Sequence, residues 1–462
     1  MDVPRSPPAP WVVFSAVAVG TFMATLDGNI VAVALPTVGR ELGVPIARLE
    51  WIVNAYLLAI SASLLAQGRL GDLLGHRAVF AGGMAIFTAG SILCGAAPGY
   101  AGLVAARVFQ ALGASAMMAI APAAVTAAFP PERRGRALGG MGSVVALGLT
   151  AGPPLGGLLV AHLSWRWVFY VNVPVGIAGA IWARRILPPR RPGPRAAFDL
   201  PGAVLLAAAL AAALVALDRI AHPSPPDMAW VAAAGVLAAA LALRERRTAS
   251  PLVDGTLFRS RTLTLGLLGG LLSYGAMFSQ TFLTPFFLSR ALGLPPARLG
   301  LALSAVPVAL SIASPLSGWL SDRFGARVLG PAGMTLLAGG LLALSTAGPL
   351  TPLPSVMARL AACGAGMGLF QAPNNSAVMG SLPRERLGSG GGLLATARNL
   401  GMAAGTAIAG SLFALRAGPG ATPEAFLSGY ALALECGAAL AVLAAAASAG
   451  RGATQAAAQP AA

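Results

Sequence analysis

The sequence contains no lysine, so all 31 of its basic residues are arginines. Without lysine there is no phosphate-binding loop of the GK[ST] type and no lysine Schiff base. This excludes a P-loop ATPase, a retinal pump and a pyridoxal enzyme. Charged residues are scarce altogether, at 10% of the chain, whereas about a quarter of the residues of a soluble protein are charged.

Cysteine and histidine are also rare, with three residues of each. The cysteines lie inside apolar runs and are expected to be small buried hydrophobic residues. The histidines lie at or near loops and show no metal-ligand spacing. We therefore predict no metal site, no cofactor and no enzyme. The residues concerned are Cys94, Cys363, Cys436, His76, His162 and His222.

Hydrophobic residues make up 56% of the chain and form repeated runs long enough to span a membrane. The first run begins near Trp11 and is too long for a cleaved signal peptide, so we expect it to be retained. The predicted fold class is an all-α polytopic membrane protein with fourteen transmembrane helices. These helices are expected near residues 11–35, 50–67, 77–97, 101–128, 136–160, 167–187, 199–217, 228–243, 262–288, 298–320, 327–348, 353–380, 389–415 and 427–449.

The helices are grouped as six, two and six. We predict an N-terminal six-helix bundle in residues 1–190, and linkers with two additional helices in residues 191–261. A C-terminal six-helix bundle follows in residues 262–450, and a disordered cytoplasmic tail in residues 451–462. The two central helices are almost purely apolar, so we expect them at the periphery and not along a water-filled path.

Arginine placement predicts the orientation. With a cytoplasmic N-terminus, 21 arginines fall in cytoplasmic segments, 7 in outer loops and 3 within helices. This bias matches the positive-inside rule and explains the net charge of +16 without nucleic acid. We expect a monomeric protein of the bacterial cytoplasmic membrane, with both termini cytoplasmic.

A short glycine-rich, charged segment appears twice, at residues 68–77 and 318–327, each time between apolar runs. Such a repeat indicates two similar halves. Its glycines favour a tight turn, and its aspartate can cap a helix or pair with an arginine. The residues of interest are Gly68, Asp72, Gly75, Arg77, Asp322 and Arg323.

Three polar residues stand out in the first and fourth runs. Asp27 costs about 2.5–3.5 kcal/mol on insertion scales unless it faces a partner or a cavity, so it is a candidate functional acid. The alternative is a polar residue that only packs helices together. Arg107, one turn before Gln110, either points into a central cavity or extends to the membrane interface.

The fifth run carries small residues spaced four apart, typical of close helix packing, beside two prolines that should bend it. This face is a packing seam, a moving seam, or both. Its residues are Gly148, Gly152, Pro153, Gly156 and Gly157.

The C-terminal half has its own polar and aromatic candidates, for which structural and substrate-binding roles are equally possible. They are Tyr274, Phe278, Gln280, Phe282, Gln371, Asn374, Asn375, Arg398 and Asn399. Glu435 lies in an alanine- and leucine-rich run. It is either a proton-coupling acid or a neutral, desolvated packing residue.

Four motifs in the right order resemble the major facilitator superfamily. They are residues 68–77, residues 107–113, residues 148–157 and the first-helix stretch 26–36. The last stretch, together with residues 165–176 and the two central helices, is similar to the 14-helix drug/proton antiporter branch. The resemblance implies two six-helix bundles around a cavity, alternating access and proton-driven export.

We also assign an expected role to each candidate residue. Proton coupling is expected at Asp27, Arg107 and Glu435. Substrate contacts are expected at Asp27, Asn29, Asn54, Gln110, Phe278, Gln280, Phe282, Asn374, Asn375 and Arg398. The repeated segment is expected to act as a conformational latch, with Arg77 and Arg134 as partners of Asp72.

The predicted function is export of amphipathic drugs or other cationic or aromatic compounds in exchange for protons, with membrane lipid around the protein. The alternatives are a dedicated exporter of one self-made metabolite, such as an antibiotic or siderophore, and a lipid flippase. A membrane enzyme would need a catalytic constellation that the sequence lacks.

Overall fold

The computed structural model describes residues 9–188, 200–218, 228–248, 255–324, 326–382, 387–418 and 421–451. These residues form α-helices and one short 3-10 helix. The elements are α1 (Pro10–Leu42), α2 (Ile46–Leu74), α3 (His76–Gly95), α4 (Tyr100–Ala128), α5 (Pro131–His162), α6 (Trp167–Tyr170), α7 (Asn172–Ile186), α8 (Leu200–Asp218), α9 (Met228–Arg247), η3 (Gly255–Arg259), α10 (Arg261–Arg290), α11 (Pro296–Leu303), α12 (Ala305–Phe324), α13 (Ala326–Ser345), α14 (Leu353–Gly380), α15 (Leu387–Arg416) and α16 (Pro423–Ala449).

The pairs α6–α7 and α11–α12 are each one broken helix, so the described residues contain fourteen helical units. Ten of these units are long and apolar enough to span a membrane. The other four are α2, α6–α7, α8 and α15. The predicted all-helical membrane fold is confirmed.

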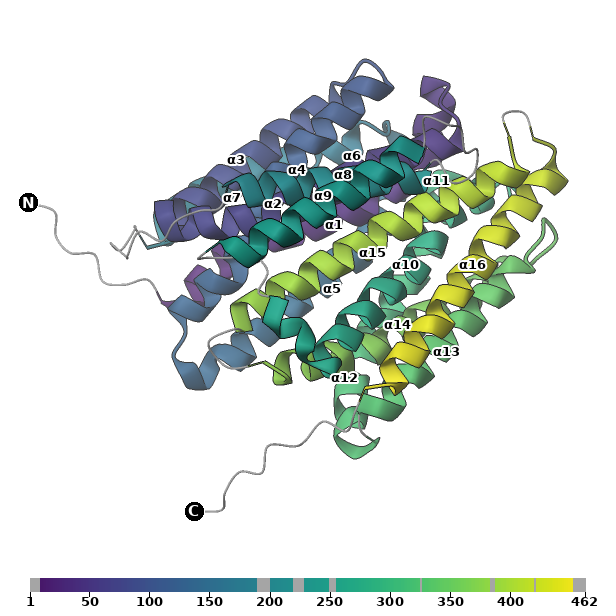
Figure 1. Ribbon diagram of the computed structural model, residues 1–462. Helices are drawn as coiled ribbons and strands as arrows, with labels where there is room; N and C mark the ends of the chain where they lie inside the picture. The colour runs from purple at the N-terminus through teal and green to yellow at the C-terminus, as the bar shows by residue number, and fades with distance from the viewer. Residues whose placement is uncertain are drawn as a thin grey trace, which may run out of the picture.

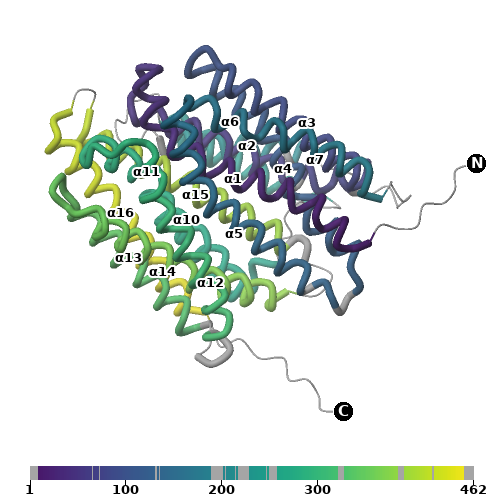
Figure 2. The backbone as a smooth tube through the Cα atoms, turned by 180° about the vertical axis from the view of Figure 1, so that it is seen from behind, coloured from purple at the N-terminus to yellow at the C-terminus, as the bar shows by residue number. Residues whose placement is uncertain are grey.

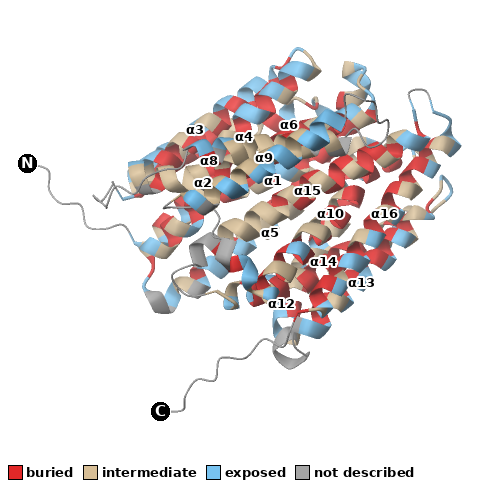
Figure 3. Cartoon of the chain, in the orientation of Figure 1, coloured by how far each residue is buried: buried red, intermediate tan, exposed pale blue. Residues whose placement is uncertain are grey.

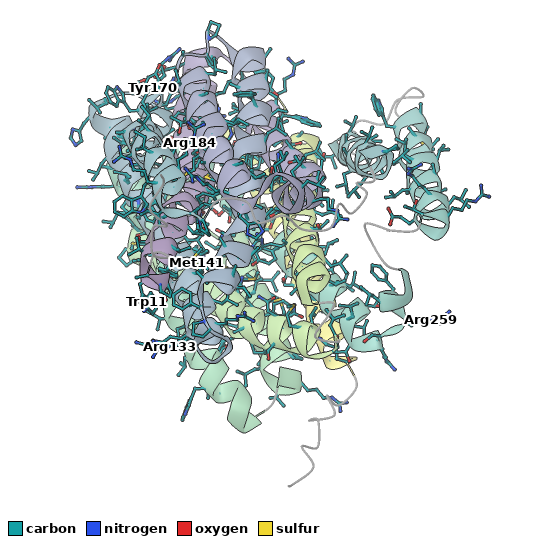
Figure 4. The ribbon with its side chains drawn as sticks, turned by 90° about the vertical axis from the view of Figure 1, so that its left-hand side faces the viewer. Trp11, Arg133, Met141, Tyr170, Arg184 and Arg259 are labelled. Atoms are coloured by element: carbon teal, nitrogen blue, oxygen red, sulfur yellow. The ribbon has the colours of Figure 1, made fainter. Side chains whose placement is uncertain are left out.

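Two helical bundles lie side by side (Figure 1). One contains α1 to α7 and the other α10 to α16. We call the end where α1 begins and α16 ends the terminal end, and the opposite end the far end. In Figure 4, Arg133 marks the terminal end and Tyr170 the far end.

The two bundles share a hydrophobic core at the far end. The largest buried cluster joins Ile30 and Leu35 of α1 to Phe286 of α10 and Leu299 of α11. The members of this cluster that belong to the N-terminal bundle all lie towards the far ends of their helices. A second cluster fills the N-terminal bundle towards the terminal end. Buried residues accordingly follow the faces where helices meet (Figure 3). The bundles are therefore packed together at the far end.

The helix ends follow from local sequence. α1 ends at Gly43, whose φ of 63° is left-handed and suits glycine. The hydroxyl of Ser260 caps α10 by accepting a hydrogen bond from the backbone N–H of Leu263.

Three helix boundaries differ from the prediction. α2 continues to Leu74, so most of the predicted loop at 68–77 is helical and only Gly75, with φ 93°, separates α2 from α3. The sixth and tenth helices are broken, at Val171 and Ser304. Pro174 and Pro307 stand three residues after these breaks, and each lacks the N–H that would bond to the carbonyl four residues earlier.

The central pair α8–α9 stands outside the two bundles (Figures 1 and 4). α8 packs on α2 of the first bundle and on α15 of the second, whereas α9 packs mainly on α8. None of the residues in the apolar stretch of α9 is buried. An all-round apolar helix with so little protein contact is suited to lipid.

Candidate functional site

A buried polar network lies inside the N-terminal bundle and joins five helices. At its centre, Arg107 of α4 forms an ion pair with Asp27 of α1, with 2.5 Å between Nη1 and Oδ2. The two side chains are 1% and 0% exposed. An uncompensated charge would be very costly at such a position, so each side chain offsets the charge of the other.

Further hydrogen bonds fix the geometry of this pair. Arg107 donates through Nε to the carbonyl of Ile52 on α2 (3.2 Å) and through Nη1 to Gln110 Oε1 (2.6 Å). Gln110 Nε2 in turn donates to Asp27 Oδ1 and to Ser91 Oγ on α3, both at 2.9 Å. Asn172 of α7 completes the set by donating to Asp27 Oδ1 at 3.1 Å. The carboxylate therefore accepts bonds from three side chains.

An aromatic ring closes the network on one side. The guanidinium carbon of Arg107 lies 3.8 Å from the centroid of the Tyr56 ring, which favours a cation–π contact. The position of Arg107 differs from both alternatives considered for it. It neither faces a cavity nor reaches the membrane interface, because Asp27 holds it in the bundle interior.

Sequence reasoning found Asp27, Arg107 and Gln110 but missed Asn172, Ser91 and Tyr56. Asn172 is an amide within an apolar run and carried a detectable signal. Ser91 and Tyr56 carried none, since serine and tyrosine are common in membrane helices.

The glycines of α5 allow close approach on two sides. An added Cβ at Gly152 would lie 3.0 Å from Asn29 Cβ on α1, and one at Gly156 would lie 2.8 Å from Ile30 Cγ1. Gly148 faces α1 as well, at Thr25. Gly157 instead faces the other bundle, because its Cβ would lie 2.5 Å from the carbonyl oxygen of Pro296. Figure 2 shows α5 running between α1 and the C-terminal bundle.

Close contact continues across this seam. Gly300 of α11 packs against the carbonyl of Pro153, so α5 and α11 touch through glycine backbones near the far end. On the opposite seam, Glu50 of α2 packs against Gly410 of α15 and is fully buried. Glu50 was also missed from the sequence, although an acid one turn into a membrane helix is a signal. Both seams between the bundles are therefore closed at the far end.

A cavity of about 230 Å³ lies in the C-terminal bundle, towards the terminal end of α10, α14 and α15. Two aromatic rings, three side-chain amides and one guanidinium line it. They belong to Tyr274, Phe370, Gln371, Asn374, Asn375 and Arg398. Gln371 Nε2 donates to the Tyr274 hydroxyl at 2.5 Å. The side-chain amide oxygen (Oδ1) of buried Asn374 has no hydrogen-bond partner.

The remaining predicted contacts are dispersed. Gln280 and Phe282 are buried in α10, and Phe278 is partly buried between the two hydrophobic clusters. Asn54 is 1% exposed, and its side-chain amide oxygen (Oδ1) has no hydrogen-bond partner. Glu435 is exposed on α16 and is not brought to the Asp27 network.

The latch residues are only partly described. The side chains of Asp72, Asp322 and Arg323 lie outside the described residues. Arg134 donates from Nε to the carbonyl of Phe129 at the end of α4 (3.1 Å). Gly68 and Gly75 lie at the terminal end, as does Arg77. Among the described residues, no group of three or more His, Cys, Asp or Glu is placed to hold a metal.

Two helical bundles packed through glycine seams, with an internal ion pair and a cavity in one bundle, are the architecture of a membrane transporter. Residues 17–406 match the model of the Major Facilitator Superfamily, and the chain belongs to that family.

The chain is similar to several bacterial transporters. It is 34% identical to the riboflavin transporter RibZ of Clostridioides difficile, over 87% of this chain and 88% of that one. It is 36% identical to the multidrug resistance protein Stp of Mycobacterium tuberculosis (86% and 75%). It is 34% identical to the tetracenomycin C resistance and export protein of Streptomyces glaucescens (88% and 77%).

The fold is also that of a solved structure, a bacterial homologue of the human lysosomal transporter Spinster. The TM-score is 0.70 at 15% identity, with 96% of this chain and 97% of that chain covered. These comparisons support a transporter and not an enzyme.

Proposed function

We propose that this protein exports amphipathic small molecules across a bacterial cytoplasmic membrane in exchange for protons. The observation that carries the proposal is the buried pair of Asp27 and Arg107, which ties five helices of one bundle together. Relatives named as multidrug resistance and antibiotic export proteins support the direction of transport.

The coupling follows from the chemistry of this pair. Protonation of Asp27 removes its negative charge and leaves Arg107 as an uncompensated cation inside the bundle. Breaking a buried pair in this way costs about 3–5 kcal/mol. One proton crossing 100 mV supplies roughly 2.3 kcal/mol, so proton entry and helix rearrangement are of comparable energy. The bundle relieves the cost by changing its packing against the other bundle.

The arginine bias supports an orientation with both termini in the cytoplasm. With this orientation, the far end is the outer side, and the closed seams together with the terminal-side cavity correspond to an inward-facing state. We further propose that the segment around Asp72, Arg77 and Arg134 holds the inner side closed in the opposite state.

Transport by purified protein in liposomes tests the proposal, with ethidium, fluorescein and riboflavin as probes. Export predicts probe flux that requires an acidic compartment on the outer side and stops when a protonophore collapses the gradient. Equal flux without the gradient contradicts proton coupling. Flux of several unrelated probes supports multidrug export, whereas flux of one alone supports a dedicated exporter.

Riboflavin transport is a second candidate. It is favoured by the 34% identity to the riboflavin transporter, and by the amides and aromatic rings of the cavity, which suit a planar heterocycle. Competition by unlabelled riboflavin against the other probes would reveal it.

A further inference from the structure

The charges that the cavity presents differ from those expected for a cation exporter. Arg398 is the charged residue among the cavity-lining residues, and it is half-buried on α15. Among the residues that the structure describes, no aspartate or glutamate lines the cavity. The acid nearest the centre of the other bundle, Asp27, is 0% exposed and is already paired with Arg107. A cationic ligand in this cavity would therefore meet an arginine and no free carboxylate.

Arg398 also has weak protein partners. Its Nε lies 3.5 Å from the Oδ1 of Asn399, at the limit of a hydrogen bond. The guanidinium also interacts with the Tyr274 hydroxyl, a neutral group. On α16, which packs against α15, the described acids are Glu424 at the far end and Glu435, which is exposed. The guanidinium is thus left with capacity to bind an anion in the bidentate manner typical of arginine.

The groups around Arg398 suit a planar partner. The rings of Tyr274 and Phe370 supply apolar faces on which an aromatic system can stack. The side-chain amides of Gln371, Asn374 and Asn375 also line the cavity and can bond to a polar group of the same ligand.

We propose that this cavity selects aromatic substrates that carry an acidic group, such as a carboxylate, phenolate or enolate, and that Arg398 binds this group. The proposal rests on the proposed function, because it names the substrate class of that transporter. It places substrate binding in the C-terminal bundle and the proton-linked pair in the N-terminal bundle. Substrate and proton then act on different bundles and are coupled through the packing between them.

Two dyes with the same xanthene ring system and opposite charge test this selection: fluorescein, an anion, and rhodamine 123, a cation. Binding is measured by fluorescence anisotropy on the full-length protein in lipid nanodiscs, where both faces of the membrane meet the same pH. The wild-type protein is expected to bind fluorescein at least tenfold more tightly. Tighter binding of rhodamine 123, or no binding of either dye, would overturn the proposal without any variant.

Variants of Arg398 then assign the group. Arg398→Gln should lose at least tenfold in fluorescein affinity while rhodamine 123 binding does not weaken. Arg398→Lys should keep part of the affinity, because it retains the charge but not the bidentate geometry. Arg416→Gln, at the exposed end of the same helix, is the matched control and should bind as the wild type does. Unchanged fluorescein binding by a folded Arg398→Gln protein would overturn the assignment.

Failure of this inference and failure of the proposed function remain distinguishable. Charge-selective binding without gradient-driven flux would contradict proton coupling and leave the substrate class standing. Gradient-driven export of rhodamine 123 together with rejection of fluorescein would contradict the substrate class and leave proton-coupled export standing.

Discussion

Replacing Asp27 by asparagine removes the charge that neutralises Arg107 while keeping the shape of the side chain. The guanidinium is 1% exposed and has no route to water in this state. Its remaining hydrogen-bond partners are the Ile52 carbonyl and the amide oxygen of Gln110, and these groups and the Tyr56 ring beside it are all neutral. Loss of one member of a buried pair costs about 3–5 kcal/mol, so Asp27→Asn should be clearly less stable in this conformation.

The double variant Asp27→Asn/Arg107→Gln separates stability from coupling. It removes both charges, so most of the lost stability should return, since neutral replacement of a buried pair is often tolerated. Gradient-driven export should remain absent in both variants, because neither has an acid at this position. In the double variant, stability is therefore expected to recover while gradient-driven export stays absent.

Thermal unfolding of the detergent-solubilised proteins measures the first quantity, and probe flux in liposomes measures the second. Ser91→Ala is the control: it removes an acceptor for Gln110 and a donor to the carbonyl of Phe87 on the same helix, leaves the ion pair in place and should retain export. Wild-type export by Asp27→Asn would refute the coupling role. A double variant no more stable than the single one would refute the argument from the unpaired guanidinium.

Three further substitutions test the packing. Gly300→Val places a side chain against the backbone of α5, so it should prevent closure of the far end, slow transport and increase labelling of far-end cysteines. Gly339→Ala, whose Cβ meets nothing, is its control. Gly75→Ala should cost about 1–3 kcal/mol because φ is 93°, whereas Gly82→Ala should be neutral in an unfolding assay. A cysteine at Val236 of α9, which is 67% exposed, should react with a lipid-phase reagent and not with a water-soluble one. Protection of that cysteine by substrate would contradict its peripheral position.

The fold could be predicted from sequence because its signals are local. Apolar runs fix the helices, and the repeated segment at 68–77 and 318–327 indicates two halves. The breaks at Val171 and Ser304 were missed because membrane helices often tolerate proline, so Pro174 and Pro307 alone do not predict a break.

The site was less predictable because it depends on pairing over long distances. Asp27 and Arg107 are 80 residues apart, and nothing in either helix says that they meet. An arginine in a membrane helix is compatible with a cavity, an interface or a partner, and only the packing of α1 against α4 decides among them. The same holds for Arg398, whose significance comes from its place in a cavity whose described lining residues include no aspartate or glutamate.

The position of α8 makes the two seams of the molecule unequal. The seam between α2 and α15 is covered by α8, with α9 outside it, whereas the seam formed by α5 with α11 and α12 has no such cover among the described helices. A compound dissolved in the bilayer therefore meets α8 and α9 at the α2–α15 seam, but meets α5 and α12 directly at the other seam. Lateral entry of lipophilic molecules from the membrane should accordingly be one-sided, along α5 and α12.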